Sequence, residues 1–129
     1  MVALNPAVVD LVPALETYGR LFPGHYAGTH IEGRIAVIQF SGQVEERRAA
    51  VEMLLGRDAP VEVRQVRYSL DDLGAFARTV EADREWFSSV GAELSTVSPR
   101  AQDNVVELTY RANNVDVEAA IVSHFGNVD

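Results

Sequence analysis

The sequence predicts an α+β protein in which a strand–strand–helix unit occurs twice, with small and mostly antiparallel sheets. Alternating apolar runs bounded by turn residues occur in two places along the 129 residues, and a segment with helical spacing and a closing glycine follows each of them. A composition of 47% hydrophobic and 23% charged residues is typical of globular chains. We therefore expect the chain to be folded throughout.

The first predicted element is an N-terminal helix within residues 1–24. Asn5 is a suitable N-cap ahead of Pro6, because proline favours the first helical position. Apolar residues then recur at helical spacing. We expect Pro13 to interrupt this helix, and the Pro-Gly pair that closes the segment to end it.

Residues 25–68 are predicted to form the first unit, a hairpin followed by a helix and a third strand. The hairpin strands alternate over Tyr26–Glu32 and Ile35–Phe40, with a glycine turn between them. The helix is expected over Val44–Leu55, because apolar side chains recur at helical intervals and a glycine follows. The third strand is expected over Val61–Tyr68.

The apolar residues of this third strand change face along its length. Val61 and Val63 face one way, whereas Val66 and Tyr68 face the other. We therefore expect either a bulge between the two pairs or a strand that is covered on both faces.

Residues 69–90 are predicted to form a connecting helix. Ser69 and Asp72 resemble a capping box with the shorter acid, and apolar side chains continue at helical spacing to the end of the segment. Trp86 and Phe87 are adjacent near that end. We expect one of these aromatic side chains to lie in the core and the other to be half-exposed.

Residues 91–129 are predicted to form the second unit. Its strands are expected over Glu93–Ser98 and Val105–Tyr110, joined by a turn. A last helix should begin after Asn113 or Asn114 and end at a glycine. We treat the four stretches together as one compact domain.

The two units match without gaps when the first is moved forward by seventy positions. The coinciding residues are Ala36, Ile38, Phe40, Ala50, Val51, Leu55 and Gly56 in the first unit and Val106, Leu108, Tyr110, Ala120, Ile121, Phe125 and Gly126 in the second. Strands and helices have different apolar periods, so a match across both favours a true repeat. The counterpart of the third strand would fall near position 131. We therefore expect either that the sequence was cut from a longer protein, or that the second sheet has a free edge open to strand addition.

The outward faces of the two predicted sheets differ. Ile35 and Val37 in the first unit correspond to Val105 and Glu107 in the second, so the first face is the more apolar. We expect the N-terminal helix to pack over Ile35 and Val37. The alternative is that these four residues belong to a protein-contact surface.

The charge of the chain disfavours nucleic acid and membranes as partners. The net charge is −8, and all 11 basic residues are arginines, so a basic patch for phosphate groups is not expected. A lysine-free composition rich in alanine, valine and arginine would suit a bacterial genome of high GC content. The lack of cysteine and of a leader-like N-terminal segment leaves the compartment open.

The residues indicate no enzyme. None of His25, His30 and His124 has a glutamate or histidine at the helical spacing of a zinc site, so we expect no metal and no other cofactor. The acidic residues occupy mainly polar helical positions, and no serine-nucleophile motif is present. A small hydrolase is therefore the least favoured function.

Three short motifs resemble the prodomains of α-lytic-protease-type (streptogrisin-like) secreted serine proteases. They are Tyr26-Ala27-Gly28, then Arg67-Tyr68-Ser69-Leu70 with Leu73, and Asn104-Val105-Val106. The resemblance covers residues 26–126, although the stretch from Ser98 to Gln102 lacks the acidic residue expected before the asparagine.

The resemblance implies a stand-alone relative of these prodomains without the protease. Such prodomains assist the folding of their protease and then inhibit it, partly by pairing a sheet edge of the C-terminal half with a protease strand. That function needs no catalytic residues. It would also imply export after removal of a leader, and otherwise the chain would be cytoplasmic.

We therefore expect a non-enzymatic protein-binding module that acts through a sheet edge or face on a protein partner or on a second copy of itself. The alternative is a small-ligand sensor or regulatory domain with a cleft between the two repeats. That pocket would be lined by Tyr26, His30, Tyr68 and Trp86.

Overall fold

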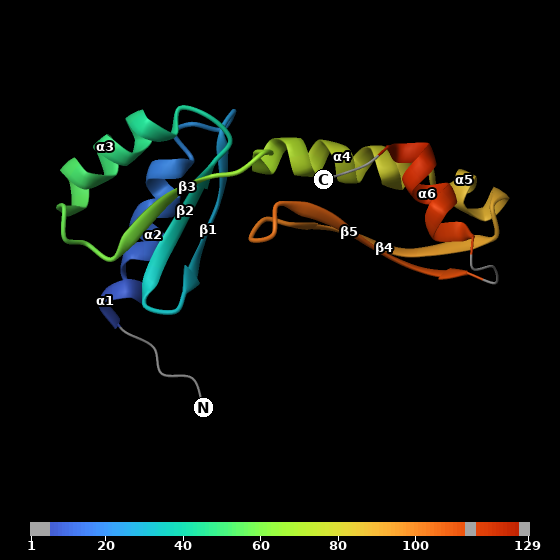
Figure 1. Ribbon diagram of the computed structural model, residues 1–129, viewed down its shortest axis with the longest axis horizontal. Coiled ribbons are helices and arrows are strands. Elements are labelled where there is room, and N and C mark those ends of the chain that lie inside the picture. Colours follow the sequence, from blue (N-terminus) through green and yellow to red (C-terminus); the bar gives the residue numbers. More distant parts are fainter. Residues whose placement is uncertain (1–5, 113–115, 127–129) are drawn as a thin grey trace. The chain divides into compact units, whose positions relative to one another are not determined.

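The computed structural model describes residues 6–112 and 116–126, which form an α+β protein with one three-stranded and one two-stranded sheet (Figure 1). Backbone contacts divide the chain into two compact units, Met1–Asp72 and Leu73–Asp129. Each unit contains its own buried apolar cluster. The treatment of the whole chain as one compact domain stays a prediction.

The first sheet has the order β1-β2-β3, formed by Tyr26–Glu32, Ile35–Phe40 and Val61–Gln65. β1 and β2 are an antiparallel hairpin. β3 runs parallel to β2, because helix α3 (Val44–Leu55) carries the chain back along the sheet between them. The bounds of β1, β2 and α3 confirm the sequence prediction, and β3 forms one edge of the sheet.

β3 is shorter than predicted. It ends at Gln65, after which Val66 donates one more backbone hydrogen bond to the carbonyl of Phe40 at 3.0 Å and the chain leaves the sheet. The register of β3 with β2 is continuous. The prediction of a bulge, or of a strand covered on both faces as far as Tyr68, is therefore wrong, because the apolar pattern changes face where the strand ends.

The N-terminal segment forms two short helices, α1 (Pro6–Val9) and α2 (Leu11–Gly19), with a break at Asp10. The prediction placed this break at Pro13, which instead lies in the first turn of α2. A proline ring clashes with the carbonyl four residues earlier, which here belongs to Val9, the last residue of α1. Pro13 therefore breaks the helix upstream of itself.

The N-terminal helices and α3 share one face of the first sheet. The buried cluster on that face consists of Val8, Leu15, Tyr26, Ala36, Ile38, Phe40, Val44, Val51 and Val63. Because side chains alternate along a strand, Ile35 and Val37 point to the opposite face. The prediction that the N-terminal helix packs over Ile35 and Val37 is therefore wrong.

A β-bulge reverses the side-chain alternation near the start of β1. Tyr26 and Thr29 both pair with inward-facing residues of β2, and the register shifts between them around Gly28, whose φ is 102°. The Oη atom of Tyr26 and the Oγ1 atom of Thr29 lie 2.8 Å apart. After the bulge, His30 faces the other side of the sheet.

The second unit contains a β-hairpin covered on one face by helices (Figure 1). The strands β4 (Ala92–Arg100) and β5 (Val105–Ala112) pair antiparallel. Helix α6 (Val117–Phe125) follows and ends at Gly126, as predicted. The predicted caps Asn113 and Asn114 lie outside the described residues. The order strand–strand–helix occurs in both units, and the interpretation of these units as copies stays a prediction.

The predicted connecting helix is divided into α4 (Leu70–Ala82) and α5 (Arg84–Ser89). Its start confirms the capping box, because Ser69 and Asp72 each accept the other's backbone N–H at 3.0 Å. The prediction of one continuous helix is wrong. The N–H of Asp83 bonds only three residues back, which tightens the chain and ends the α-helical ladder.

None of the described helices has the length and apolar character that crossing a membrane would need.

Candidate functional site

The residues of the predicted small-ligand pocket are placed in different surroundings. Tyr26 packs into the first core with its ring centroid 6.0 Å from that of Phe40, whereas His30 lies on the opposite face of the sheet. Tyr68 follows β3 and is half-buried, and Trp86 belongs to the second unit. Tyr26 and His30 are therefore not brought together, because the bulge places them on different faces.

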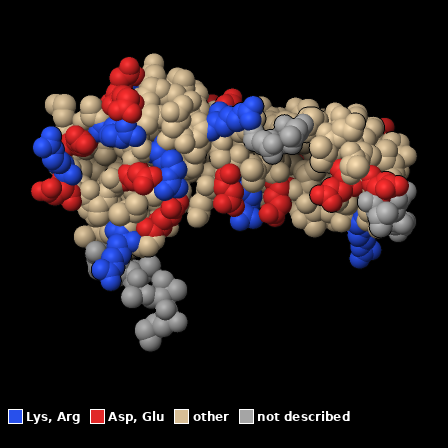
Figure 2. Space-filling view, in the orientation of Figure 1, with Lys and Arg blue, Asp and Glu red and all other residues tan. Residues whose placement is uncertain are grey.

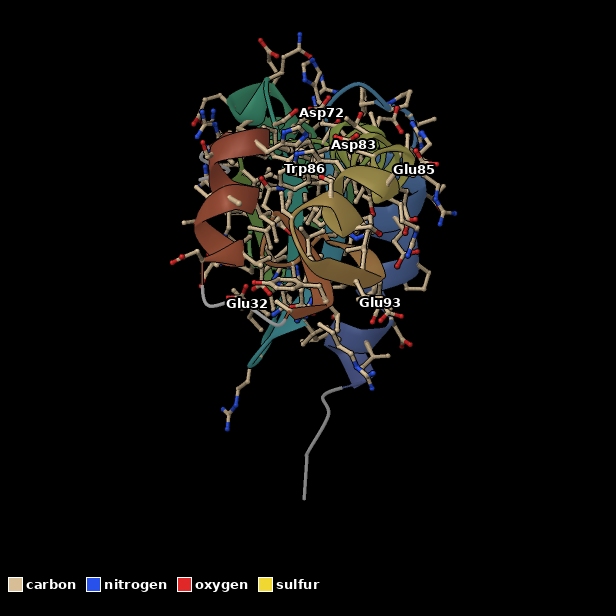
Figure 3. The ribbon with its side chains drawn as sticks, turned by 90° about the vertical axis from the view of Figure 1, so that its right-hand side faces the viewer. Glu32, Asp72, Asp83, Glu85, Trp86 and Glu93 are labelled. Carbon is tan, nitrogen blue, oxygen red and sulfur yellow. The ribbon has the colours of Figure 1, made fainter. Side chains whose placement is uncertain are left out.

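Trp86 has a clear packing role within the second unit (Figure 3). Its ring stacks on that of His124 with centroids 3.8 Å apart, and His124 Nε2 lies 2.7 Å from Asp83 Oδ2. The adjacent Phe87 is fully buried, while Trp86 is half-buried. This difference confirms the prediction that one of the two aromatic side chains lies in the core and the other is half-exposed. Through His124, α6 contacts both Trp86 on α5 and Asp83 at the break between α4 and α5.

The predicted protein-contact residues differ in accessibility. Val105 is 37% exposed, and Glu107 is exposed and accepts a hydrogen bond from Arg100 at 2.9 Å. Ile35 is half-buried, whereas Val37 is fully buried. The side chain of Val37 therefore cannot contact a partner directly in this conformation.

An ionic network crosses the outward face of the first sheet. Arg64 on β3 donates to both carboxylate oxygens of Glu32 on β1, at 2.6 and 3.2 Å, and its Nε donates to Glu62 at 2.6 Å. His30 Nε2 lies 2.6 Å from Glu32. In the register of the three strands, the pair between β1 and β3 crosses β2 at Val37. The network therefore ties both outer strands together over the central one.

These contacts strongly favour the charged form of Glu32. Hydrogen bonds from Arg64, and next from His30, lower the pKa of the Glu32 carboxyl from 4.5 to about 2. A carboxyl whose pKa is lower in the folded than in the unfolded chain stabilises the fold above its unfolded pKa. That contribution is lost as the pH falls through the folded pKa.

We predict that Glu32→Gln destabilises the first unit at neutral pH and has progressively less effect as the pH falls from about 5 toward 2. The measurement is urea unfolding of both proteins at a series of pH values. The control is Glu118→Gln on α6, because Glu118 is exposed. A difference between Glu32→Gln and the wild type that stays constant across this range would contradict the assignment.

The outer edge of β3 lies in a groove of about 610 Å³. All residues of β3 line the groove, together with Arg48, Val51 and Glu52 of α3 and part of the connecting loop. Since side chains from both faces of β3 contribute, the groove follows the edge of the strand rather than one face. Acidic and basic side chains are interspersed over the surface of this unit in the view of Figure 2.

The pairing with β2 determines which backbone groups face this groove. The N–H of Ala36 on β2 donates to the carbonyl of Pro60, and the N–H of Val66 donates to the carbonyl of Phe40 on β2. Positions 60 and 66 flank β3, and backbone groups alternate in direction along a strand, so the even-numbered residues of β3 direct theirs toward β2. Val61, Val63 and Gln65 therefore direct theirs to the edge. The N–H of Val61 already donates to the carbonyl of Ala59 in the preceding loop. The edge thus offers peptide groups chiefly at Val63 and Gln65.

One side chain already contacts this edge. Arg48 Nη2 donates to the carbonyl of Val63 at 3.1 Å, and the same guanidinium pairs with Glu45. A carbonyl oxygen has two acceptor positions, so this bond leaves one position for another donor. Arg48 therefore partly covers the edge without blocking the N–H groups of β3.

The free edges of the second sheet are of two kinds. β4 contains Pro99, which has no N–H to donate, and its register with β5 shifts between Leu94 and Thr96. Both features discourage another strand from pairing with β4. β5 has neither feature, and the described residues contain no third strand beside it. The two alternatives expected for this edge, a sequence cut from a longer protein or a free edge, both stay predictions.

Sequence reasoning missed the groove at β3. The prediction extended this strand to Tyr68 and placed the free edge in the second unit alone. The sequence did contain a signal for this edge. A helix joins β2 to β3, which indicates a parallel pair, and because β1 already pairs with the other side of β2, β3 is the outer strand.

The described residues contain no cluster of three or more His, Asp or Glu side chains suited to holding a metal ion. A scan against protein-family models found none that matches the chain, and a search of curated proteins found no match either. The fold and site thus define a class, an α+β protein with an open sheet edge, and the resemblance to protease prodomains stays a prediction.

Proposed function

We propose that this chain is a non-enzymatic protein-binding module that takes up an extended segment as an additional strand along β3. The observation that carries the proposal is the groove of about 610 Å³ along the outer edge of that strand. In strand addition, main-chain hydrogen bonds supply affinity and alternate side chains supply specificity.

The geometry of the groove supports this function in two ways. The N–H groups of Val63 and Gln65 face outward at the two-residue spacing that an added strand uses. Val51 and Val61 provide apolar wall on the helix side, whereas Glu62 and Arg64 lie on the other. An added segment would therefore meet apolar contacts on one face and charges on the other.

The test compares Gln65→Pro with Gln65→Thr. Gln65 is exposed and its N–H faces the edge, so proline there removes an outward donor while leaving the ladder with β2 intact. Threonine keeps the donor and favours strand structure. Both variants should retain the circular-dichroism spectrum of the wild type.

The probe is a phage-displayed library of random linear peptides, selected on the wild-type protein. We expect the selected peptides to bind the wild type and Gln65→Thr, and to bind Gln65→Pro at least tenfold more weakly. Equal binding to the two variants would refute the edge as the binding site.

The resemblance to secreted-protease prodomains supports a finer proposal, in which the partner is a secreted serine protease that the chain helps to fold or inhibits. The regular edge of β5 is the candidate surface for that contact, since it carries no proline and no bulge. Inhibition of a streptogrisin-type protease by the purified chain is the measurement. It should weaken when Leu108 on β5 is replaced by proline.

A further inference from the structure

We propose that the segment added along β3 is the β3 strand of a second copy of this chain, paired antiparallel about a two-fold axis at Val63. The inference rests on the proposed function, because it names the partner of the same edge. Joining the two edges would make one continuous six-stranded sheet from two three-stranded ones.

The hydrogen-bond pattern permits this register. In an antiparallel pair centred on Val63, Val63 lies opposite its own copy and Val61 lies opposite Gln65 of the second copy. These are the residues whose backbone groups face the edge. Antiparallel ladders pair outward-facing residues with outward-facing residues, so each Val63 can donate to and accept from the other.

The charges on the outward face select this register over its neighbours. With the axis at Val63, Glu62 of each copy lies directly opposite Arg64 of the other, which gives two complementary cross-strand pairs. With the axis at Glu62, two glutamates would face each other, and with the axis at Arg64, two arginines would. Of these three registers, the one centred on Val63 avoids like-charge pairs and forms complementary ones.

The existing contacts leave room for these pairs. Arg64 uses one N–H of each of its three nitrogens for Glu32 and Glu62. A guanidinium has five N–H donors, so two remain for the second copy. The five-residue length of β3 limits the paired backbone. We therefore expect a dimer that dissociates on dilution.

The experiment is sedimentation of full-length Glu62→Arg, Arg64→Glu and their equimolar mixture, beside the wild type. The wild type should form a dimer as its concentration rises. Each variant alone places two like-charge pairs across the axis and should remain monomeric. The mixture should dimerise again, because arginine at 62 then faces glutamate at 64 and glutamate at 62 faces arginine at 64.

A matched control is Glu118→Arg, which makes the same change of charge as Glu62→Arg but at an exposed position on α6. This variant should dimerise like the wild type. Arg64→Glu also loses the ion pair with Glu32, so thermal melting must first show that this variant is folded. If Arg64→Glu is not folded, the comparison of dimer formation by Glu62→Arg with that by Glu118→Arg is the test.

The outcomes separate this inference from the proposed function. A wild type that is monomeric at every concentration, or a dimer that Glu62→Arg does not weaken, would overturn the self-pairing. Peptide binding that Gln65→Pro weakens and Gln65→Thr retains could still hold in either case, since it requires only the open edge. Loss of both would reject the edge as a binding surface.

Discussion

Replacing Gly19 with alanine is expected to destabilise the first unit by about 3 kcal/mol, the upper part of the range for over-packed cores. Gly19 is buried at the end of α2, and a Cβ atom there would lie 2.3 Å from two ring atoms of Tyr26. Such a distance is far below van der Waals contact. Either the ring or the helix must move.

The Tyr26 ring has little freedom to move. It is 6% exposed, packs against Phe40, and its hydroxyl is bonded to Thr29. The substitution therefore forces a shift in the contact between α2 and β1, even though alanine is the better helix former. This cost should exceed the gain in helix propensity of about 1 kcal/mol.

Gly24→Ala is the matched control, because a Cβ at Gly24 meets no atom within 4 Å. Its effect should lie within about 0.5 kcal/mol of zero. Urea unfolding followed by far-ultraviolet circular dichroism measures both variants. Equal stability of the two would mean that α2 does not approach β1 as closely as the structure shows.

The sequence could predict the strands and helices of the first unit because their patterns are local. The alternation over β2 and the helical spacing of α3 gave bounds that the structure confirms. Regular alternation does not hold across β1, so Tyr26 and His30, both assigned to one predicted pocket, lie on different faces. A bulge at Gly28 reverses the faces, and a lone glycine in a strand does not distinguish a bulge from a regular residue.

The helix breaks show a second limit of local reasoning. Pro13 was recognised as a helix breaker, but its effect falls at Asp10, since the clash is with the preceding turn. The break at Asp83 has no proline or glycine to signal it. It coincides with the contact between Asp83 and His124, two residues far apart in the chain, and local spacing does not reveal such a contact.

The sequence predicted the kind of candidate site, an open sheet edge, but not the strand that forms it. Free-edge reasoning from the missing third strand pointed to the second sheet, where the structure does describe only two strands. The groove along β3 is lined by that strand and by α3, and the sequence indicates the outer position of β3 through its helical connection but not the groove itself. The charge alternation of Glu62 and Arg64 was visible, yet it has meaning only once β3 is known to be an edge.

Replacing Phe87 with alanine is expected to destabilise the second unit by about 3–5 kcal/mol. Phe87 is fully buried, and its ring lies 5.6 Å from that of Phe125 on α6 and 5.2 Å from that of Trp86. Truncation leaves a cavity where α5 meets α6. The neighbouring rings cannot collapse into this space without giving up the stacking of Trp86 on His124.

Trp86 is the only tryptophan of the chain, so its fluorescence reports on this unit alone. The unfolding midpoint of Phe87→Ala in urea should fall well below that of the wild type when followed by this signal. Val122→Ala on α6 is the control, because Val122 is 48% exposed and its truncation should cost less than about 1 kcal/mol. A Phe87→Ala midpoint close to that of Val122→Ala would show that Phe87 is not central to the second core.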